Sequence, residues 1–183
     1  MIDELNNDEQ LVQQIQKGSG EAMSILYRRH RPAILRYTQA RVYDWQEAQD
    51  LTGEIFLRMV AHLPQYQNTG APFTAWLFRI AHNMIITHRQ KESRIPLVAI
   101  SHADNSSRPE DNPALLVENE IEMDWVWRGL QQLDEVQRDV IILRFLIGLS
   151  LQEAAHALDK SVGAIKTLQH RGILALRVAL QVA

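Results

Sequence analysis

Apolar residues recur at helical spacing through most of this 183-residue chain, and this periodicity constrains its fold more than any other feature. Between residues 45 and 62, for example, Ala48, Leu51, Ile55 and Met59 follow one another at intervals of three and four. Such residues share one face of a helix. No segment shows a convincing alternation of the kind found in half-buried strands. The sequence therefore predicts an all-α fold.

The expected helices fall into two groups separated by a stretch without periodicity. Residues 96–114 are rich in proline, serine, aspartate and asparagine, a composition typical of a linker. Pro32 suits either the first turn of a helix or a kink. We therefore expect two small helical domains, 1–95 and 120–183, joined by a linker at 96–119. The predicted helices cover about 8–17, 20–37, 45–62, 72–91, 137–146, 150–158 and 162–180.

Composition excludes several kinds of site. The chain has no cysteine, so disulfides, thiolate metal sites and cysteine nucleophiles are impossible. The seven histidines are scattered, and none has the spacing that places two metal ligands on one helical face. No apolar run approaches the roughly 18 residues that a membrane helix requires, and no signal-peptide core follows the acidic start. We therefore expect a cytoplasmic protein with no metal, no cofactor and no membrane partner.

Charge is distributed unevenly although the net charge is only −3. Residues 96–123 hold one cation and six acidic residues, which makes the linker acidic. Residues 160–183 hold four cations and no acidic residue, and residues 79–94 hold four cations against Glu92 alone. Local basic faces of this kind matter more for phosphate binding than the charge of the whole chain does.

The most specific local pattern lies near the C-terminus. Ser150 and Glu153 form a capping-box pattern, residues 159–160 suit a tight turn, and Ser161 is a good N-cap for the next helix. Two short helices joined in this way indicate a helix-turn-helix, whose second helix enters the major groove of DNA. The alternative is a helical hairpin with a solvated basic face. Four residues fall on the outer side of the second helix: Lys166, Thr167, His170 and Arg171.

An acidic pair lies on the helix expected at 45–62. Asp50 and Glu54 are one turn apart, opposite the apolar face, and Arg58 follows one turn later. By spacing alone this is a solvated face with a Glu54–Arg58 ion pair. Two carboxylates can also do acid–base chemistry, but no nucleophile or metal-ligand set accompanies them.

An aromatic segment runs from Phe73 to Asn83. Phe73, Trp76, Leu77, Ile80 and Met84 lie on one predicted stripe, so most of them belong to a core. Alternatively, Trp76 and the preceding loop offer stacking surfaces for unpaired bases, with nearby cations on the phosphates.

In this order and at this spacing, these segments resemble the extracytoplasmic-function (ECF) group of the sigma-70 family of RNA polymerase sigma factors. The resemblance covers nearly all of the chain except the linker. It rests on residues 26–30, 48–57, 73–83, 140–144, 148–150, 153–155 and 162–171.

The resemblance implies a promoter-reading subunit with no chemistry of its own. The first domain would dock on the clamp helices of core RNA polymerase through Asp50, Glu54 and Leu57. The second domain would sit on the flap, and an anti-sigma factor is a further expected partner. The −35 element would be read by Ser161, Lys166, Thr167, His170 and Arg171. The −10 element would be read by Tyr66, Asn68, Thr69, Trp76, Arg79, Asn83, Arg89 and Lys91, with loop 65–71 as the pocket for an extruded base.

The chain departs from the usual family pattern at five positions: Gln49, Gly53, Thr87, Gln90 and Asp159. At the last, glycine usually makes the helix-turn-helix turn, although aspartate tolerates the left-handed conformation. Two other classes of protein are alternatives, a one-component helix-turn-helix regulator with a ligand-sensing N-terminal half and a helical enzyme. The sequence offers no ligand-pocket signature, dimerisation heptads or catalytic set for either.

Overall fold

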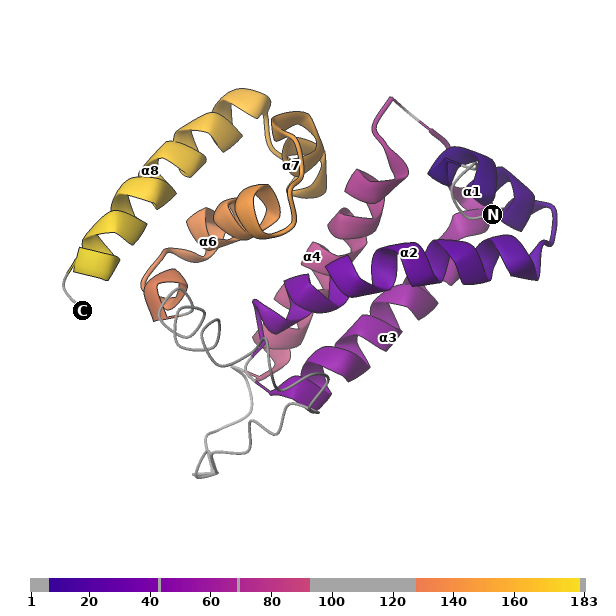
Figure 1. Ribbon diagram of the computed structural model, residues 1–183, viewed down its shortest axis with the longest axis horizontal. Helices are drawn as coiled ribbons and strands as arrows, with labels where there is room; N and C mark the ends of the chain where they lie inside the picture. Colours follow the sequence, from indigo (N-terminus) through magenta and orange to yellow (C-terminus); the bar gives the residue numbers. More distant parts are fainter. Residues whose placement is uncertain (1–6, 43, 69, 93–127, 182–183) are drawn as a thin grey trace, which may run out of the picture.

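The computed structural model describes residues 7–42, 44–68, 70–92 and 128–181, and in these ranges all regular structure is helical (Figure 1). The all-α prediction is confirmed. The predicted linker, 96–119, lies outside the described residues. In chain order the elements are α1 (Asp8–Gln16), α2 (Gly20–Gln39), α3 (Trp45–His62), the 3₁₀ turn η1 (Leu63–Gln65), α4 (Phe73–Glu92), α6 (Glu135–Ile141), the π-helical turn η2 (Ile142–Leu146), α7 (Leu151–Ala157) and α8 (Val162–Gln181).

Side-chain caps explain where the first helices begin. Asn7 and Gln10 form a capping box at α1, Ser19 caps α2, and Asp44 caps α3. The predicted bounds of α3, 45–62, are confirmed. Pro32 does not start a helix, because α2 continues from Gly20 to Gln39 across it. The buried residues on both sides of Pro32 stabilise α2 through tertiary packing, which offsets the backbone hydrogen bond that proline cannot donate.

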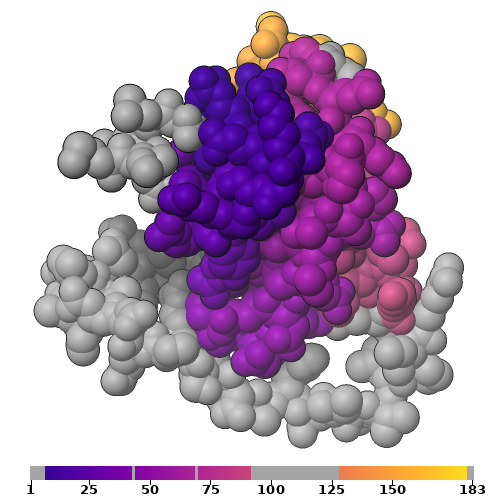
Figure 2. Space-filling model, turned by 90° about the vertical axis from the view of Figure 1, so that its right-hand side faces the viewer, coloured from indigo at the N-terminus to yellow at the C-terminus, as the bar shows by residue number. Residues whose placement is uncertain are grey.

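Helices α1 to α4 form one unit, in which α2 packs on α1, α3 and α4 (Figure 1). The space-filling view shows α1 and α2 covering one side of this unit next to α3 and α4 (Figure 2). Helices α6, α7 and α8 form a second unit, in which α8 packs on both α6 and α7. Helix α6 begins at Glu135, after the N-cap Asp134, two residues before the expected start at Gln137.

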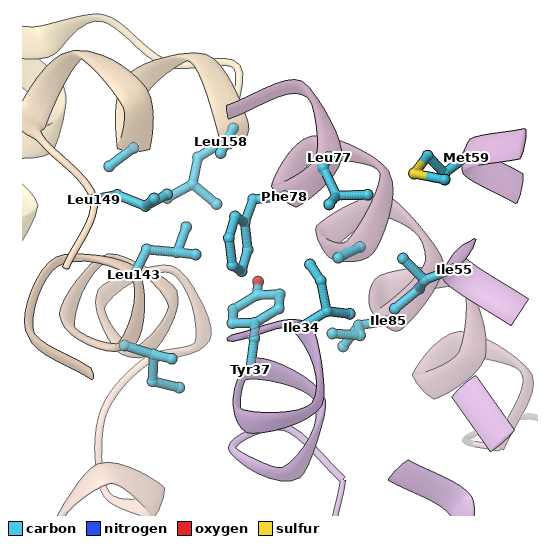
Figure 3. Packing of buried hydrophobic residues seen from close by; sticks show 14 of the residues in the cluster. Ile34, Tyr37, Ile55, Met59, Leu77, Phe78, Ile85, Leu143, Leu149 and Leu158 are labelled. Atoms are coloured by element: carbon cyan, nitrogen blue, oxygen red, sulfur yellow. The ribbon is translucent and has the colours of Figure 1, made fainter. Parts of the chain in front are cut away.

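The two units share one hydrophobic core. Helix α4 of the first unit packs against α7 of the second. Tyr37 and Phe78 are fully buried at this junction, with ring centroids 5.6 Å apart in an edge-on arrangement. Leu143, Leu149 and Leu158 approach the Phe78 ring from the second unit (Figure 3). Because small units bury a small fraction of their surface, this shared core adds apolar burial that neither achieves alone.

The junction also corrects the apolar stripe predicted for α4. Phe73 and Leu77 are buried as expected, but Trp76, Ile80 and Met84 are only half-buried. Four further residues of α4 are fully buried, namely Ala75, Phe78, Ala81 and Ile85. The stripe is shifted because α4 faces its own unit on one side and the second unit on the other, an arrangement that periodicity within one helix does not reveal.

Candidate nucleic-acid interface

The helix-turn-helix predicted for the second unit is present in α7 and α8. The Ser150 hydroxyl accepts from the Glu153 N–H at 3.1 Å, and the Glu153 carboxylate accepts from the Ser150 N–H at 2.7 Å. The turn residue Asp159 has φ +53°, the left-handed conformation expected there. The Ser161 hydroxyl then accepts from the Ala164 N–H at 3.1 Å and caps α8.

The outer side of α8 carries the predicted −35 residues. Lys166, Thr167, His170 and Arg171 are all exposed, whereas Ile165 is fully buried. Gly172 brings α8 against α6, since a Cβ there would lie 2.9 Å from Ile141 Cγ1. The helix is thus fixed by its inner side, and its basic side remains available to a groove of DNA.

An aromatic cluster closes the loop between α3 and α4. The Tyr66 ring lies 4.8 Å from the Trp76 ring and 5.7 Å from the Phe73 ring, measured between centroids. The Tyr66 hydroxyl is buried and has no hydrogen-bond partner among the residues that the structure describes. Burial, with the Glu9 and Asp8 carboxylates nearby, raises the pKa of Tyr66, so its hydroxyl stays protonated and remains a donor.

The remaining loop residues are held by local bonds. The Asn68 side-chain oxygen accepts from the Gly70 N–H at 2.9 Å, and Gly70 has φ +93°. This is an Asx-type turn that glycine completes without steric cost. Thr69, the other predicted pocket residue of the loop, lies outside the described residues.

The predicted −10 residues of α4 other than Trp76 divide into two pairs. Asn83 and Lys91 are exposed. Arg79 instead pairs with Asp159 at 3.1 Å, and Arg89 pairs with Glu135 at 2.7 Å, both across the junction with the second unit. Two arginines of the candidate −10 surface are therefore held by carboxylates of the second unit.

A buried charged cluster at the same junction was not anticipated from the sequence. Arg41 Nε lies 3.1 Å from Asp139 Oδ1, and both side chains are almost fully buried. The Tyr37 hydroxyl donates to Asp139 Oδ1 at 3.3 Å, and His82 Nδ1 lies 3.5 Å from Asp139 Oδ2. Burial raises the pKa of Asp139 against the opposing effect of Arg41. Burial also lowers the pKa of His82, although Asp139 opposes that shift.

One signal in the sequence could have pointed to this cluster. Asp139 is an acidic residue next to the apolar run 140–143, and it shares a helical face with Val136 and Leu143. An acidic residue at such a position predicts a buried counter-charge. Nothing local identifies Arg41 as the partner.

The predicted polymerase-docking residues lie together on α3. Asp50 and Glu54 are exposed, and Leu57 is 72% exposed, the largest value among the exposed large apolar side chains of the described residues. The carboxylates line a shallow acidic hollow, whose edge also carries a contact between the His88 ring and the Glu47 carboxylate. The expected Glu54–Arg58 ion pair does not form in the part of the chain that the structure describes. An exposed pair of this kind gains little in water.

Other classes of site find no support in the described ranges. No group of three or more histidine, aspartate or glutamate residues there is arranged to hold a metal ion. None of the described helices is both long enough and apolar enough to span a bilayer. What the geometry does bring together is a helix-turn-helix, an aromatic loop beside basic residues, and an acidic face with an exposed leucine.

These features define an all-α protein of the helix-turn-helix DNA-binding class. A model of sigma-70 region 2 matches residues 26–95, and a model of sigma-70 region 4 matches residues 129–178. The chain belongs to the ECF group of the sigma-70 family. It is thus a transcription initiation factor that binds core RNA polymerase, with region 2 reading the −10 element and region 4 the −35 element.

Curated relatives agree with this family, and a solved structure shows the same fold. The chain is 36% identical to the ECF RNA polymerase sigma factor BldN of Streptomyces coelicolor, over 91% of this chain and 63% of that protein. It is 30% identical to the ECF RNA polymerase sigma factor ShbA of Streptomyces griseus, over 91% of this chain and 92% of that protein. The fold is similar to that of CnrH, solved in complex with the cytosolic domain of CnrY, with a TM-score of 0.75 and 24% identity over 97% of this chain and 99% of that one.

Proposed function

We propose that residues 1–95 form the domain that docks on polymerase and opens the −10 element, and that residues 120–183 form the domain that reads the −35 element. The acidic linker at 96–119 would run through the active-site and RNA-exit region of the polymerase. Cationic groups that line this path and later contact RNA would favour the negative charge of the linker. The observation that carries this proposal is the capped α7–turn–α8 unit with its exposed basic side, preceded in the chain by the aromatic loop.

For the −35 element, Lys166, Thr167, His170 and Arg171 would face the major groove, with Ser161 at the start of α8. We assign a base-edge role to Arg171 and a phosphate role to Lys166. Losing a base contact costs about 1–3 kcal/mol and relaxes the preference at one position. Losing a phosphate contact weakens binding to all sequences alike and lowers the salt slope by roughly 0.9.

These two roles can be separated by one experiment. Arg171→Ala and Lys166→Ala are assayed for binding to a panel of −35 variants at several salt concentrations. We expect Arg171→Ala to change sequence preference, and Lys166→Ala to weaken binding to all variants alike and to lower the salt slope. If neither variant changes affinity, preference or slope, the basic side of α8 is a solvated face.

For the −10 element, the loop after α3 would hold one base extruded from the non-template strand. Extrusion costs a few kcal/mol of unstacking, which a shaped pocket recovers. Tyr66 and Trp76 offer aromatic faces, and Asn68 and Thr69 offer hydrogen-bonding groups. Asn83, Lys91, Arg79 and Arg89 would track the strand, which requires the last two to exchange their carboxylate partners for phosphates.

For polymerase, Asp50, Glu54 and Leu57 would dock on the clamp helices, and the second domain would sit on the flap. Exposed carboxylates around an exposed leucine suit a basic partner with an apolar contact at its centre. Reversing the charge of both Asp50 and Glu54 should weaken binding to core enzyme without unfolding the chain. Unchanged affinity for core enzyme would remove this face from consideration.

An anti-sigma factor, a cytoplasmic location and the lack of any catalytic activity complete the proposal. The rival, a one-component regulator, would bind its DNA site without polymerase and usually as a dimer. Mixing the chain with sigma-free core polymerase distinguishes the two, because a sigma factor forms a complex with the core and yields promoter-specific transcripts.

A further inference from the structure

The loop that follows α3 is tied to a helix that precedes it by about 50 residues. The Gln16 side-chain amide, at the end of α1, donates to the carbonyl oxygens of Leu63 and Tyr66, both at 3.0 Å. Leu63 is the first residue of η1 and Tyr66 follows its last, where the chain leaves α3 and turns toward α4. One side chain therefore fixes the first half of the loop.

A second tie from α1 fixes the middle of the loop. The Asn68 amide nitrogen donates to Glu9 Oε1 at 2.7 Å, while its oxygen accepts from the Gly70 N–H. An asparagine amide has two donor hydrogens and two acceptor lone pairs. These two bonds hold the Asn68 amide in one orientation. They leave one N–H donor and one acceptor lone pair free, which can pair with an acceptor and a donor on the edge of a base.

Helix α1 is itself fixed on α2, so the Gln16 and Glu9 side chains that bind the loop are held in place. Asp8 pairs with Arg29 and with His30, both at 2.8 Å. Burial would raise the pKa of Asp8, but the bonds from His30 and Arg29 hold it below its ordinary value, so the carboxylate is charged at neutral pH. Leu11 and Val12 of α1 are buried in the core. The matched region 2 begins only at residue 26, so α1 lies before it.

We propose that Gln16 and Glu9 are positioning residues for base selection at the −10 element. They do not touch the base. They hold the carbonyls of the loop and the orientation of Asn68, and thereby fix which base edge fits beside Tyr66. Base discrimination in this chain then depends on a helix outside the matched region 2. The inference rests on the proposed role of the loop in reading the −10 element.

The test compares Gln16→Glu with Gln13→Glu in the full-length chain. Gln16→Glu keeps the shape but turns a double donor into an anion facing two carbonyls. Gln13→Glu makes the same charge change at an exposed position of the same helix whose side chain has no hydrogen bond among the described residues. Initiation is measured with core polymerase on promoter libraries randomised at the −10 or the −35 element.

We expect Gln16→Glu to reduce discrimination between −10 bases about tenfold, equivalent to about 1.4 kcal/mol. Discrimination at the −35 element should not change, and Gln13→Glu should match the unmodified chain at both elements. A variant that merely loosened the fold would lower initiation from all promoters alike. Equal −10 discrimination in Gln16→Glu and Gln13→Glu would overturn the inference.

A second variant decides the matter if Gln16→Glu does not fold. Glu9→Leu removes one exposed tie to the loop, and it should also relax −10 discrimination while leaving −35 discrimination intact. Unaltered −10 discrimination in Glu9→Leu would then reject the inference. If the unmodified chain selects bases at the −35 element but none at the −10 element, the proposed function of the loop fails. That outcome is distinct from failure of the positioning role.

Discussion

Removing the Asp139 carboxylate tests how strongly the two units are held together. The Arg41 and Asp139 side chains are 1% and 4% exposed. Asp139→Ala would leave the Arg41 guanidinium buried without a counter-charge. Breaking a buried ion pair from one side typically costs about 3–5 kcal/mol. That figure is an upper limit here, because the substitution also removes the free-energy cost of burying the Asp139 carboxylate. The raised pKa of Asp139 reflects this cost of burial.

The cost should appear as separation of the units, because each unit supplies one partner. Opening the junction lets water reach Arg41 without unfolding either helix bundle. A loss of about 3 kcal/mol corresponds to a shift of roughly 100-fold toward the separated state. We therefore expect Asp139→Ala to open the chain while α3 and the helix-turn-helix remain folded.

The assay uses the absence of cysteine from the chain. Cysteines introduced at the exposed positions Glu21 and Gln152 can carry spin labels on the two units. In Asp139→Ala the distance distribution should broaden and gain a long component. The double variant Arg41→Met with Asp139→Leu should restore the short distance, since an apolar pair of similar volume packs without charge burial. An unaltered distribution in Asp139→Ala would show that the pair does not hold the junction.

Three further changes probe the same framework. Burial, aided by Arg41, keeps the pKa of His82 below its usual 6.5 against the pull of Asp139, so the separated state takes up the proton first as pH falls. The label distance should therefore lengthen progressively below about pH 6.5, and His82→Gln should remove this component. Ser150→Ala deletes an N-cap and should cost about 1 kcal/mol, measured as a lower Tm. Gly172→Ala forces a methyl group into the contact between α6 and α8 and should cost about 1–3 kcal/mol in a denaturant titration.

Features that depend on local spacing could be predicted from the sequence. The bounds of α3 follow from its periodicity and flanking residues, and the turn at Asp159 follows from the tolerance of aspartate for positive φ. The capping box at Ser150 is likewise a local pattern. Helical spacing also places Lys166, Thr167, His170 and Arg171 on the outer side of the second helix of the helix-turn-helix. The polymerase-docking residues and most of the −10 residues depend on the family resemblance, because spacing alone favours a solvated face and a core for those two segments.

Contacts between distant segments were beyond such reasoning. The Gln16 ties join residues 47 and 50 positions apart, and the Tyr37–Asp139 bond joins residues 102 apart. Periodicity identifies which face of a helix is apolar but not which other helix covers it. For that reason the second buried face of α4, around Phe78, and the ion pairs of Arg79 and Arg89 with the second unit were not foreseen.

The turn at Asp159 has a consequence for how such a chain can evolve. The residue makes the helix-turn-helix turn through its backbone and pairs with Arg79 through its carboxylate. Glycine would adopt the same backbone conformation more readily but would carry no charge. The ion pair between Asp159 and Arg79 is exposed and contributes about 0–1 kcal/mol, so Asp159→Gly should change the stability of the contact only slightly. One substitution can thus remove a charged contact between the two units while the backbone of the helix-turn-helix turn keeps its conformation.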